Sequence, residues 1–306
     1  MRKNWTKFIC PVFNMDLSII IVSYNAKEFL KECIESIYKT TKNIQFEIIV
    51  SDNNSTDGTV DMLKKLQTEN FQLIENKNNL GFSKANNVGV KKASGRYLLF
   101  LNPDIIVHED TLEGMVEFMD NHHEAGAATC KLVMPNGQTD DASHRGSPTP
   151  WNALAHFSRL SKLFGKTKLF GGYNLGYLNL NETHEIEALA GAFMLVRRKA
   201  GEEAGWWDED YFFYGEDLDF CYMLKENGWK IYYVPEYSVL HYKGVSGGIK
   251  KVSKDITTAD EETKTRSQRE RFRAMRLLYK KHYEQKYPWL ITRLVYLGIS
   301  LKQRMS

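Results

Sequence analysis

The sequence predicts an α/β protein built on a mostly parallel sheet, and two features of its N-terminal third carry that prediction. The continuous apolar run Leu17–Tyr24 is rich in β-branched residues, which is typical of a buried strand. Apolar residues at helical spacing follow it from Phe29 to Ile37, and the strand–helix pattern then repeats. Strands that alternate with helices are joined by right-handed crossovers and form a parallel sheet. We therefore expect ligands to bind beyond the carboxyl ends of these strands.

The remaining elements are expected in the following order. Apolar runs predict strands at 46–50, 71–74 and 96–101, and helical spacing predicts helices at 60–66 and 83–93. Residues 134–185 are rich in Pro and Gly and lack periodicity, which is typical of an irregular region that faces a substrate. Beyond this region the pattern predicts strands at 186–196 and 231–234, a helix at 216–227 and helices from about residue 263.

Composition excludes several classes of protein. The chain has 306 residues, of which 42% are apolar, and this is typical of a globular protein. No window approaches the roughly 18 uninterrupted apolar residues of a spanning helix, so a polytopic membrane protein is excluded. Residues 1–15 lack the apolar core of a secretory signal, and we expect an N-terminal extension on a cytoplasmic chain. The scattered Cys10, Cys33, Cys130 and Cys221 predict reduced thiols, most of them buried, rather than disulfides or a zinc site.

The charge is divided unevenly along the chain. The net charge is +3, but residues 250–306 contain 15 Lys and Arg against 6 Asp and Glu, so the rest of the chain is acidic. This division predicts an acidic catalytic domain over residues 16–250 and a basic helical extension over residues 251–306 that has its own partner.

Two polar clusters follow predicted strands. The first strand–helix turn contains no glycine, so neither the GxGxxG nor the GxxxxGK[ST] phosphate loop is present. We therefore expect that the sheet recognises a nucleotide through side chains and a metal. In SDNNSTDGT, Asp52 could accept hydrogen bonds from a base or ribose, or the segment could simply form an Asx turn and a helix cap. In FLNPDI, Asp104 could hold a divalent cation against a diphosphate, or it could cap a strand that the proline stops.

A third cluster combines acids with aromatic residues. Six acids lie in the run Trp206–Cys221, where burial among rings would raise a carboxyl pKa and favour a general base. The alternative for Glu216 and Asp217 is that they cap a helix N-terminus. His241 follows a predicted strand and is either a structural residue or a metal ligand.

Taken in order, these segments resemble the family-two glycosyltransferases of GT-A fold, and in particular the rhamnosyltransferase-like branch that builds bacterial surface polysaccharides. The resemblance covers roughly residues 16–248 and implies a Rossmann-like mixed sheet, mostly parallel and flanked by helices. It also implies that a sugar passes from a nucleoside diphosphate to an acceptor hydroxyl with inversion at the anomeric carbon. It rests on the segments SIIIVSYN, SDNNSTDGT, NNLGFSKANNVGV, GRYLLFLNPD, LAGAFMLVRR, FFYGEDLDFCYMLKENGW and HYKGVSGG.

The resemblance also assigns roles to residues. It implies Mg²⁺ or Mn²⁺ on Asp104, in an NPD segment that replaces the usual Asp-X-Asp, with His241 of the HxxG motif as second ligand. Asp217 would be the base, with Glu216 beside it about 100° away around the helix. The implied donor contacts are Ser23, Tyr24, Asn25, Asp52, Asn54, Asn86, Asn87 and Asn102. The implied sugar contacts are Gly191 and Ala192 in a floor of small residues, and Trp206, Trp207 and Asp208, which would stack on and bond to a sugar.

The basic extension has two interpretations. The apolar stretch Trp289–Leu301 is interrupted by Arg293 and is too short to span a bilayer, but it suits an interfacial helix on an anionic membrane. Alternatively, the C-terminal helices pack on the catalytic domain or on a second subunit in a homodimer. Nucleic acid is not expected as a partner, because the body is acidic and no binding motif is present.

These expectations combine into one hypothesis of function. The chain transfers rhamnose from dTDP-rhamnose to a saccharide or polyprenyl-linked acceptor, at the inner face of the cell membrane. The alternatives are a UDP-hexose donor in the same fold, or a non-catalytic subunit that binds sugar nucleotides. The intact NPD, ED and HxxG segments argue against a non-catalytic subunit.

Overall fold

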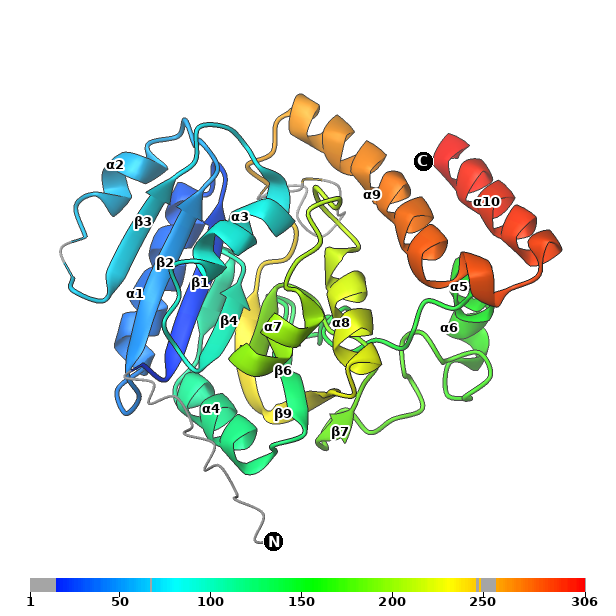
Figure 1. Ribbon diagram of the computed structural model, residues 1–306, viewed down its shortest axis with the longest axis horizontal. Helices are drawn as coiled ribbons and strands as arrows, with labels where there is room; N and C mark the ends of the chain where they lie inside the picture. Colours follow the sequence, from blue (N-terminus) through cyan, green and yellow to red (C-terminus); the bar gives the residue numbers. More distant parts are fainter. Residues whose placement is uncertain (1–14, 67, 246–247, 249–256, 306) are drawn as a thin grey trace, which may run out of the picture.

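The computed structural model describes residues 15–66, 68–245, 248 and 257–305. One nine-stranded mixed sheet runs through the molecule in the order β3-β2-β1-β4-β8-β6-β9-β5, with β7 paired to β9. Figure 1 shows helices on both faces of this sheet and two long C-terminal helices, α9 and α10, along one side of the molecule. The expected extension 1–15 lies outside the described residues except for Met15, as do Cys10 and the expected domain boundary near residue 250.

The first four major strands form the predicted parallel half of the sheet. They are β1 (Leu17–Ser23), β2 (Phe46–Asp52), β3 (Phe71–Glu75) and β4 (Tyr97–Leu101). Their crossovers contain α1 (Lys27–Thr40), α2 (Thr59–Leu63) and α3 (Gly81–Val90). Because β1 lies between β2 and β4, the segments that follow these three strands meet at one edge. The predicted strand–helix order is confirmed here.

The second half of the sheet differs from the prediction. The strand expected at 186–196 is confined to β8 (Phe193–Arg197), which runs antiparallel to β4, and the strand expected at 231–234 extends to β9 (Lys230–His241). The prediction missed the central strand β6 (Ala125–Val133) and its helix α4 (Thr111–Asn121). Short β5 (Ile105–Val107) and β7 (His184–Glu185) pair with β9. The Ala- and Gly-rich start of β6 lacks the β-branched run by which the other strands were found.

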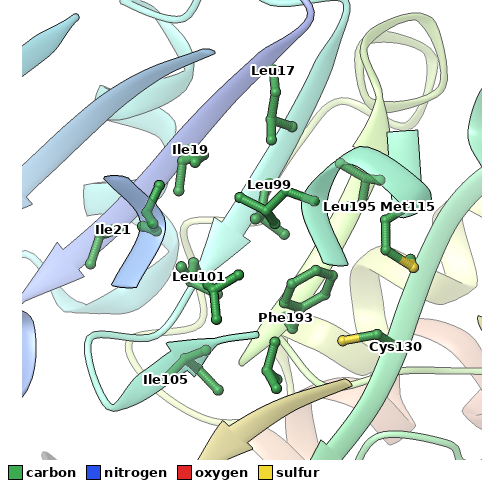
Figure 2. Close-up of a cluster of buried hydrophobic side chains, with 14 of the residues drawn as sticks. Leu17, Ile19, Ile21, Leu99, Leu101, Ile105, Met115, Cys130, Phe193 and Leu195 are labelled. Carbon is green, nitrogen blue, oxygen red and sulfur yellow. The ribbon is translucent and has the colours of Figure 1, made fainter. Parts of the chain in front are cut away.

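The core occupies both faces of the sheet. Alternation along β1 sends Leu17, Ile19 and Ile21 to the face that α1 and α4 cover, as Figure 2 shows, and Ile20 to the opposite face. The opposite face packs against α7 (Arg198–Ala204) and α8 (Glu216–Glu226). Cys33, Cys130 and Cys221 are free and buried, as predicted.

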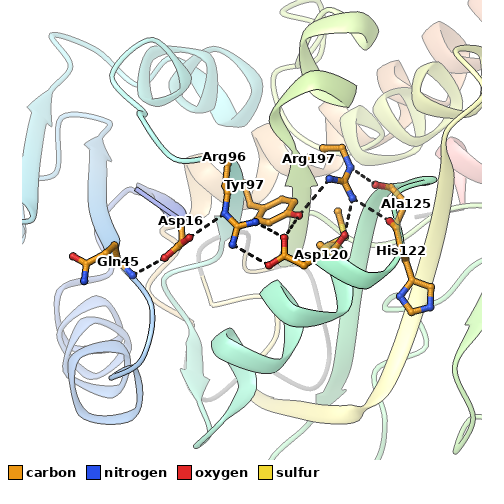
Figure 3. A network of polar contacts seen from close by, with 9 residues as sticks. Asp16, Gln45, Arg96, Tyr97, Asp120, His122, Ala125 and Arg197 are labelled. Carbon is orange, nitrogen blue, oxygen red and sulfur yellow. Dashed lines mark hydrogen bonds and ion pairs between the residues drawn. The ribbon is translucent and has the colours of Figure 1, made fainter. Parts of the chain in front are cut away.

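A polar network closes the end of the sheet opposite the site (Figure 3). Arg96, just before β4, donates from Nε to Asp16 at 3.0 Å and also pairs with Asp120 of α4. The Tyr97 hydroxyl donates to Asp120 at 2.7 Å. Arg197, at the end of β8, donates to the carbonyl oxygen of Met119 at 2.7 Å. These bonds join the amino ends of β1 and β4 to the end of α4, so this end of the sheet is fixed.

The irregular region and the C-terminal helices lie together. The region 134–185 contains only α5 (Pro150–Phe157), α6 (Leu160–Phe164) and the two-residue strand β7, in agreement with the prediction. The chain ends in α9 (Glu261–His282), a short 3-10 turn (Glu284–Lys286) and α10 (Trp289–Arg304). Across the residues described, no helix is both long enough and apolar enough to cross a bilayer.

Candidate active site

A pocket of about 120 Å³ lies at the edge where β1, β2 and β4 end. Its lining includes the residue after each of these strands, namely Tyr24, Asn53 and Asn102, together with Asp104. The sequence indicated Tyr24, Asn102 and Asp104 but missed Asn53. The Asn53 side chain donates to the carbonyl oxygen of Gly81 at 3.1 Å, so it also joins this edge to the start of α3.

Asp104 and His241 face each other beside this pocket. His241 Nε2 lies 3.6 Å from Asp104 Oδ1, both side chains are buried, and neither atom has a hydrogen-bond partner within the described part of the chain. β5 and β9 bring them together, since Ile105 pairs with His241 across the sheet. Two atoms that share a cation at about 2.1 Å from each lie at most about 4.2 Å apart, so this pair fits a divalent ion. Among the described residues, no group of three or more His, Cys, Asp or Glu side chains is arranged to hold a metal.

A second carboxylate orients the histidine. Asp140, which the sequence analysis missed, lies with Oδ2 3.1 Å from His241 Nδ1, and Lys243 donates to its other oxygen. Burial acts to lower the pKa of His241, but the Asp104 and Asp140 carboxylates outweigh it and raise that pKa to about 9. Burial would raise the pKa of Asp140, yet the bond from His241 and the charge of Lys243 bring it well below its ordinary value. A carboxylate on the far nitrogen of a histidine is a common support for a metal ligand.

Other expected donor residues lie at the same edge but do not line the pocket. Ser23 is buried with its hydroxyl unpartnered among the residues described. Asp52 is buried and accepts two bonds from Ser55, and burial raises its pKa despite those bonds. The Asn25 side chain accepts from the Thr56 amide at 2.8 Å, and Asn54 has a left-handed backbone with φ 64°. Asp52 and Asn25 therefore make the turn that the alternative interpretation expected.

Three of the expected site residues, Asn86, Asn87 and Trp207, make contacts within the fold, and the donor role of the two asparagines stays a prediction. Asn87, assigned to the ribose or donor sugar, uses its side chain to accept from the Trp207 amide and to donate to the Trp207 carbonyl. Asn86 is buried and donates to the Phe82 carbonyl oxygen. The Trp207 side chain is 1% exposed and packs edge-on against Phe100, so it cannot stack on a sugar.

The other expected sugar contacts are Trp206, Asp208, Gly191 and Ala192. Trp206 is partly buried and packs against the core cluster that contains Trp207, so its expected contact with a sugar stays a prediction. Asp208 accepts a hydrogen bond from Lys281 of α9. Ala192 accepts from the Asn102 amide at 2.9 Å, so the small residues Gly191 and Ala192 lie next to the end of β4. Neither of them lines the pocket, so the expected floor beneath donor and acceptor stays a prediction.

A larger pocket of about 410 Å³ contains the two acids of the ED segment. Asp217 accepts from Arg145 Nη2 at 2.6 Å, and Arg145 also donates to the Leu189 carbonyl at 2.8 Å. The side chains of Arg145 and Asp217 are 12% and 15% exposed, so the pair is largely desolvated. Burial acts to lower the pKa of Arg145, but the Asp217 carboxylate keeps it above its ordinary value. Arg145 lies in the irregular region, where no sequence pattern pointed to it.

Glu216 has a different environment from Asp217. It is the first residue of α8, after Gly215 with φ 83°, and its Oε2 has no hydrogen-bond partner among the described residues. Burial, reinforced by the neighbouring Asp217 charge, raises the pKa of Glu216 to about 8. Adjacent carboxyl groups in environments this different are typical of catalytic sites.

The helix α9 forms part of both pockets. Thr263, Arg266 and Ser267 line the smaller pocket, and Arg271 and Met275 are among the residues of α9 that line the larger one. Asp219 of α8 fixes α9 in place, because it accepts from His282 Nε2 at 2.6 Å and from Lys281 Nζ at 2.8 Å. Packing on the catalytic domain, one of the two interpretations of the C-terminal helices, is therefore confirmed for α9.

Comparison with known sequences establishes the family. The model of glycosyl transferase family 2 matches residues 18–200. Similar proteins include rhamnosyltransferase WbbL of Escherichia coli K12, 27% identical over 233 residues that cover 73% of this chain and 82% of the relative. N-acetylglucosaminyl-diphospho-decaprenol L-rhamnosyltransferase of Mycobacterium tuberculosis is 26% identical over 243 residues, which cover 76% of this chain and 78% of that protein. The chain belongs to glycosyl transferase family 2 and is a glycosyltransferase.

Comparison with solved structures confirms the GT-A fold. The crystal structure of GalNAc-T7 with UDP, GalNAc and Mn²⁺ matches with a TM-score of 0.57 at 20% identity, over 74% of this chain and 44% of that chain. Staphylococcus aureus TarS 1-349 matches with a TM-score of 0.53 at 18% identity, over 88% of this chain and 73% of that chain. At this level of identity the likeness defines the fold alone.

Proposed function

We propose that the chain is an inverting glycosyltransferase that moves rhamnose from dTDP-rhamnose to a lipid-linked saccharide. The observation that carries this proposal is that the same three segments of the chain line both pockets. The segment around Phe213–Asp217, the segment Lys243–Val245 and helix α9 each contribute residues to both the smaller and the larger pocket. A donor in the first pocket and an acceptor in the second would then meet at this shared wall.

The smaller pocket would take the nucleoside diphosphate. Asp104 and His241 would hold Mg²⁺ or Mn²⁺, which suits their unpartnered atoms 3.6 Å apart, and Asp140 would orient the imidazole. The cation would neutralise charge on the departing diphosphate. Arg266 of α9 lines the same pocket and would add a second positive charge there.

The larger pocket would carry out the proton transfer. Asp217 would take the proton of the acceptor hydroxyl while the hydroxyl oxygen bonds to the anomeric carbon. The bond from that carbon to the diphosphate breaks in the same step, and its electron pair leaves with the nucleoside diphosphate. Arg145 would hold Asp217 in place through the 2.6 Å bond.

Support for the donor and the acceptor comes from different observations. Two relatives are named as rhamnosyltransferases, and the name of the mycobacterial one includes a diphospho-decaprenol acceptor. In the larger pocket Arg145, Lys243 and Arg271 accompany the acids, and Leu278, Val295 and Ile299 are among the apolar lining residues. A sugar diphosphate on a hydrocarbon chain matches this combination of cations and apolar wall. The rival donor is a UDP-hexose, because TarS has been crystallised with UDP.

A donor screen tests the proposal. The protein is incubated with dTDP-rhamnose, UDP-glucose, UDP-galactose or GDP-mannose, with Mn²⁺ and a polyprenyl diphosphate-linked saccharide, and release of nucleoside diphosphate is measured. We expect turnover with dTDP-rhamnose that Asp104→Ala abolishes. Turnover with only a UDP-sugar would show that the donor is a UDP-sugar and not dTDP-rhamnose. Binding of a donor without turnover of any donor would favour a non-catalytic subunit.

A further inference from the structure

Exposed apolar side chains are gathered on one side of the molecule. Every large apolar side chain that is exposed in the described part of the chain belongs to residues 151–169 or to residues 289–305. Leu163 is 77% exposed, Trp289 68% and Leu294 56%, and no residue of α10 is buried. The complete set is Trp151, Leu154, Phe157, Leu163, Phe164, Leu169, Trp289, Leu290, Leu294, Leu297, Leu301 and Met305. A soluble protein rarely exposes such a cluster unless something covers it.

The two segments lie side by side. Val295 and Ile299 of α10 line the larger pocket together with Ala153 and Phe157 of α5. The ammonium of Lys302 lies 5.6 Å from the centre of the Phe157 ring, which places the end of α10 beside α5. Figure 1 shows α5 and α6 on the same side of the molecule as α9 and α10. We call the exposed apolar side chains of α5, α6, the loop to Leu169 and α10 the apolar face.

The charges of these segments have a single sign. Residues 150–181 contain four Lys and Arg and no Asp or Glu, and residues 287–306 contain three and none. The basic residues are Arg159, Lys162, Lys166, Lys168, Arg293, Lys302 and Arg304. Apolar side chains combined with Trp and with Lys and Arg are the composition of helices that lie in the interface of an anionic bilayer.

We propose that the apolar face docks on the surface of an anionic lipid bilayer, with α5, α6 and α10 in the headgroup region. A second copy of the chain is the less favourable occupant, because a two-fold interface would set these seven positive charges against the same seven. The binding requires no donor, metal or turnover, so it does not rest on the proposed function. It would, however, bring the larger pocket to the lipid, because α5 and α10 both line that pocket.

Vesicle flotation of the full-length protein tests the proposal. The vesicles are phosphatidylcholine alone, or phosphatidylcholine with about one-third phosphatidylglycerol, at low and high salt. We expect binding to the anionic vesicles that Leu163→Glu/Leu294→Glu weakens about tenfold or more, because each change removes an apolar contact and adds repulsion. The matched control is Lys31→Ala/Lys199→Ala on α1 and α7, which changes the net charge equally at exposed positions outside the apolar face. The control should bind as the unmodified protein does.

The outcomes distinguish a lipid bilayer from a second copy of the chain as the partner of the apolar face. Equal circular dichroism and melting temperature of the variants show that a loss of flotation is local, as expected for side chains this exposed. Loss of binding in the control as well as the variant, or retained binding in the variant, would overturn the proposal. Sedimentation of a dimer that Leu163→Glu/Leu294→Glu dissociates, with no flotation of the unmodified protein, would assign the apolar face to a second copy instead.

Discussion

Replacing Asp217 with Asn perturbs the proposed base and a buried ion pair at once. The carboxylate accepts from Arg145 Nη2 at 2.6 Å and from the Leu218 amide at 2.8 Å, one bond to each of its oxygens. An amide side chain has one oxygen, so it can keep only one of these two bonds. Asp217→Asn therefore removes the proton acceptor, the charge that compensates Arg145 and one hydrogen bond.

Two magnitudes follow from this geometry. A positioned general base contributes about 10²–10⁴ in rate, so the transfer rate should fall by that factor while donor affinity is retained. Breaking a buried pair costs about 3–5 kcal/mol, and because one hydrogen bond can survive we expect the free energy of unfolding to fall by about 3 kcal/mol. The double variant Arg145→Met/Asp217→Asn removes the uncompensated charge, so it should recover part of that stability without recovering the rate.

Single-turnover rates, donor affinities and urea unfolding of the same samples check this prediction. Glu216→Gln is the matched control, since it is the adjacent acid in the same pocket and should cost less in rate. Transfer near the normal rate by Asp217→Asn would refute the assignment of the base. If Glu216→Gln is then the inactive variant, the base is Glu216. If both variants lose donor binding, the acidic pair serves the fold or the metal instead.

Three further outcomes are expected. Chelation by EDTA should abolish transfer and Mn²⁺ or Mg²⁺ should restore it, whereas full turnover in chelated buffer would remove the cation from the mechanism. The carboxyl pKa of Glu216 is raised from about 4.5 to about 8, so folding stability should fall as pH rises between those values. Glu216→Gln should lack that fall and be more stable than the unmodified protein above pH 8, and an equal change in the free energy of unfolding of both proteins between pH 5 and pH 9 would contradict this. Asp219→Asn should lower the free energy of unfolding by about 3 kcal/mol and loosen α9, because Asp219 is buried under Lys281 and His282. Asp208→Asn, at a more exposed site, should lower it by less than about 1 kcal/mol. Thermal or urea unfolding measures these free energies, and equal losses of stability in Asp219→Asn and Asp208→Asn would show that other contacts hold α9.

Periodicity predicted the parallel half of the fold and failed in the antiparallel half for a physical reason. β1 and β4 are buried on both faces, and such strands are continuous apolar runs. β6 begins with Ala125, Gly126 and Ala127, where Trp229 and Ala200 pack close to the strand, and small residues there give no β-branched pattern. The strand expected at 186–196 was too long because apolar composition alone does not separate a buried loop from a strand.

The site was predictable where it depends on residues adjacent in sequence. Tyr24, Asn102 and Asp104 could be found because each follows a recognisable strand. Asp140 and Arg145 could not be found, because they lie in the irregular region and reach His241 and Asp217 only through the tertiary fold. The Trp207 indole was misplaced because an aromatic run beside acids fits both a sugar-binding surface and a core, and only the packing distinguishes the two.

The charge division between body and extension has an explanation within the fold. Lys281 of α9 pairs with Asp208 and Asp219 of the body, so part of the positive charge of the extension compensates acids beside the catalytic segment. Asp219 is two residues from Asp217 on α8, and α9, which Asp219 holds, lines both pockets. The extension is therefore a component of the candidate site rather than a separate appendage. Further positive charge lies with the apolar side chains of α5, α6 and α10, where Asp and Glu are absent from the sequence.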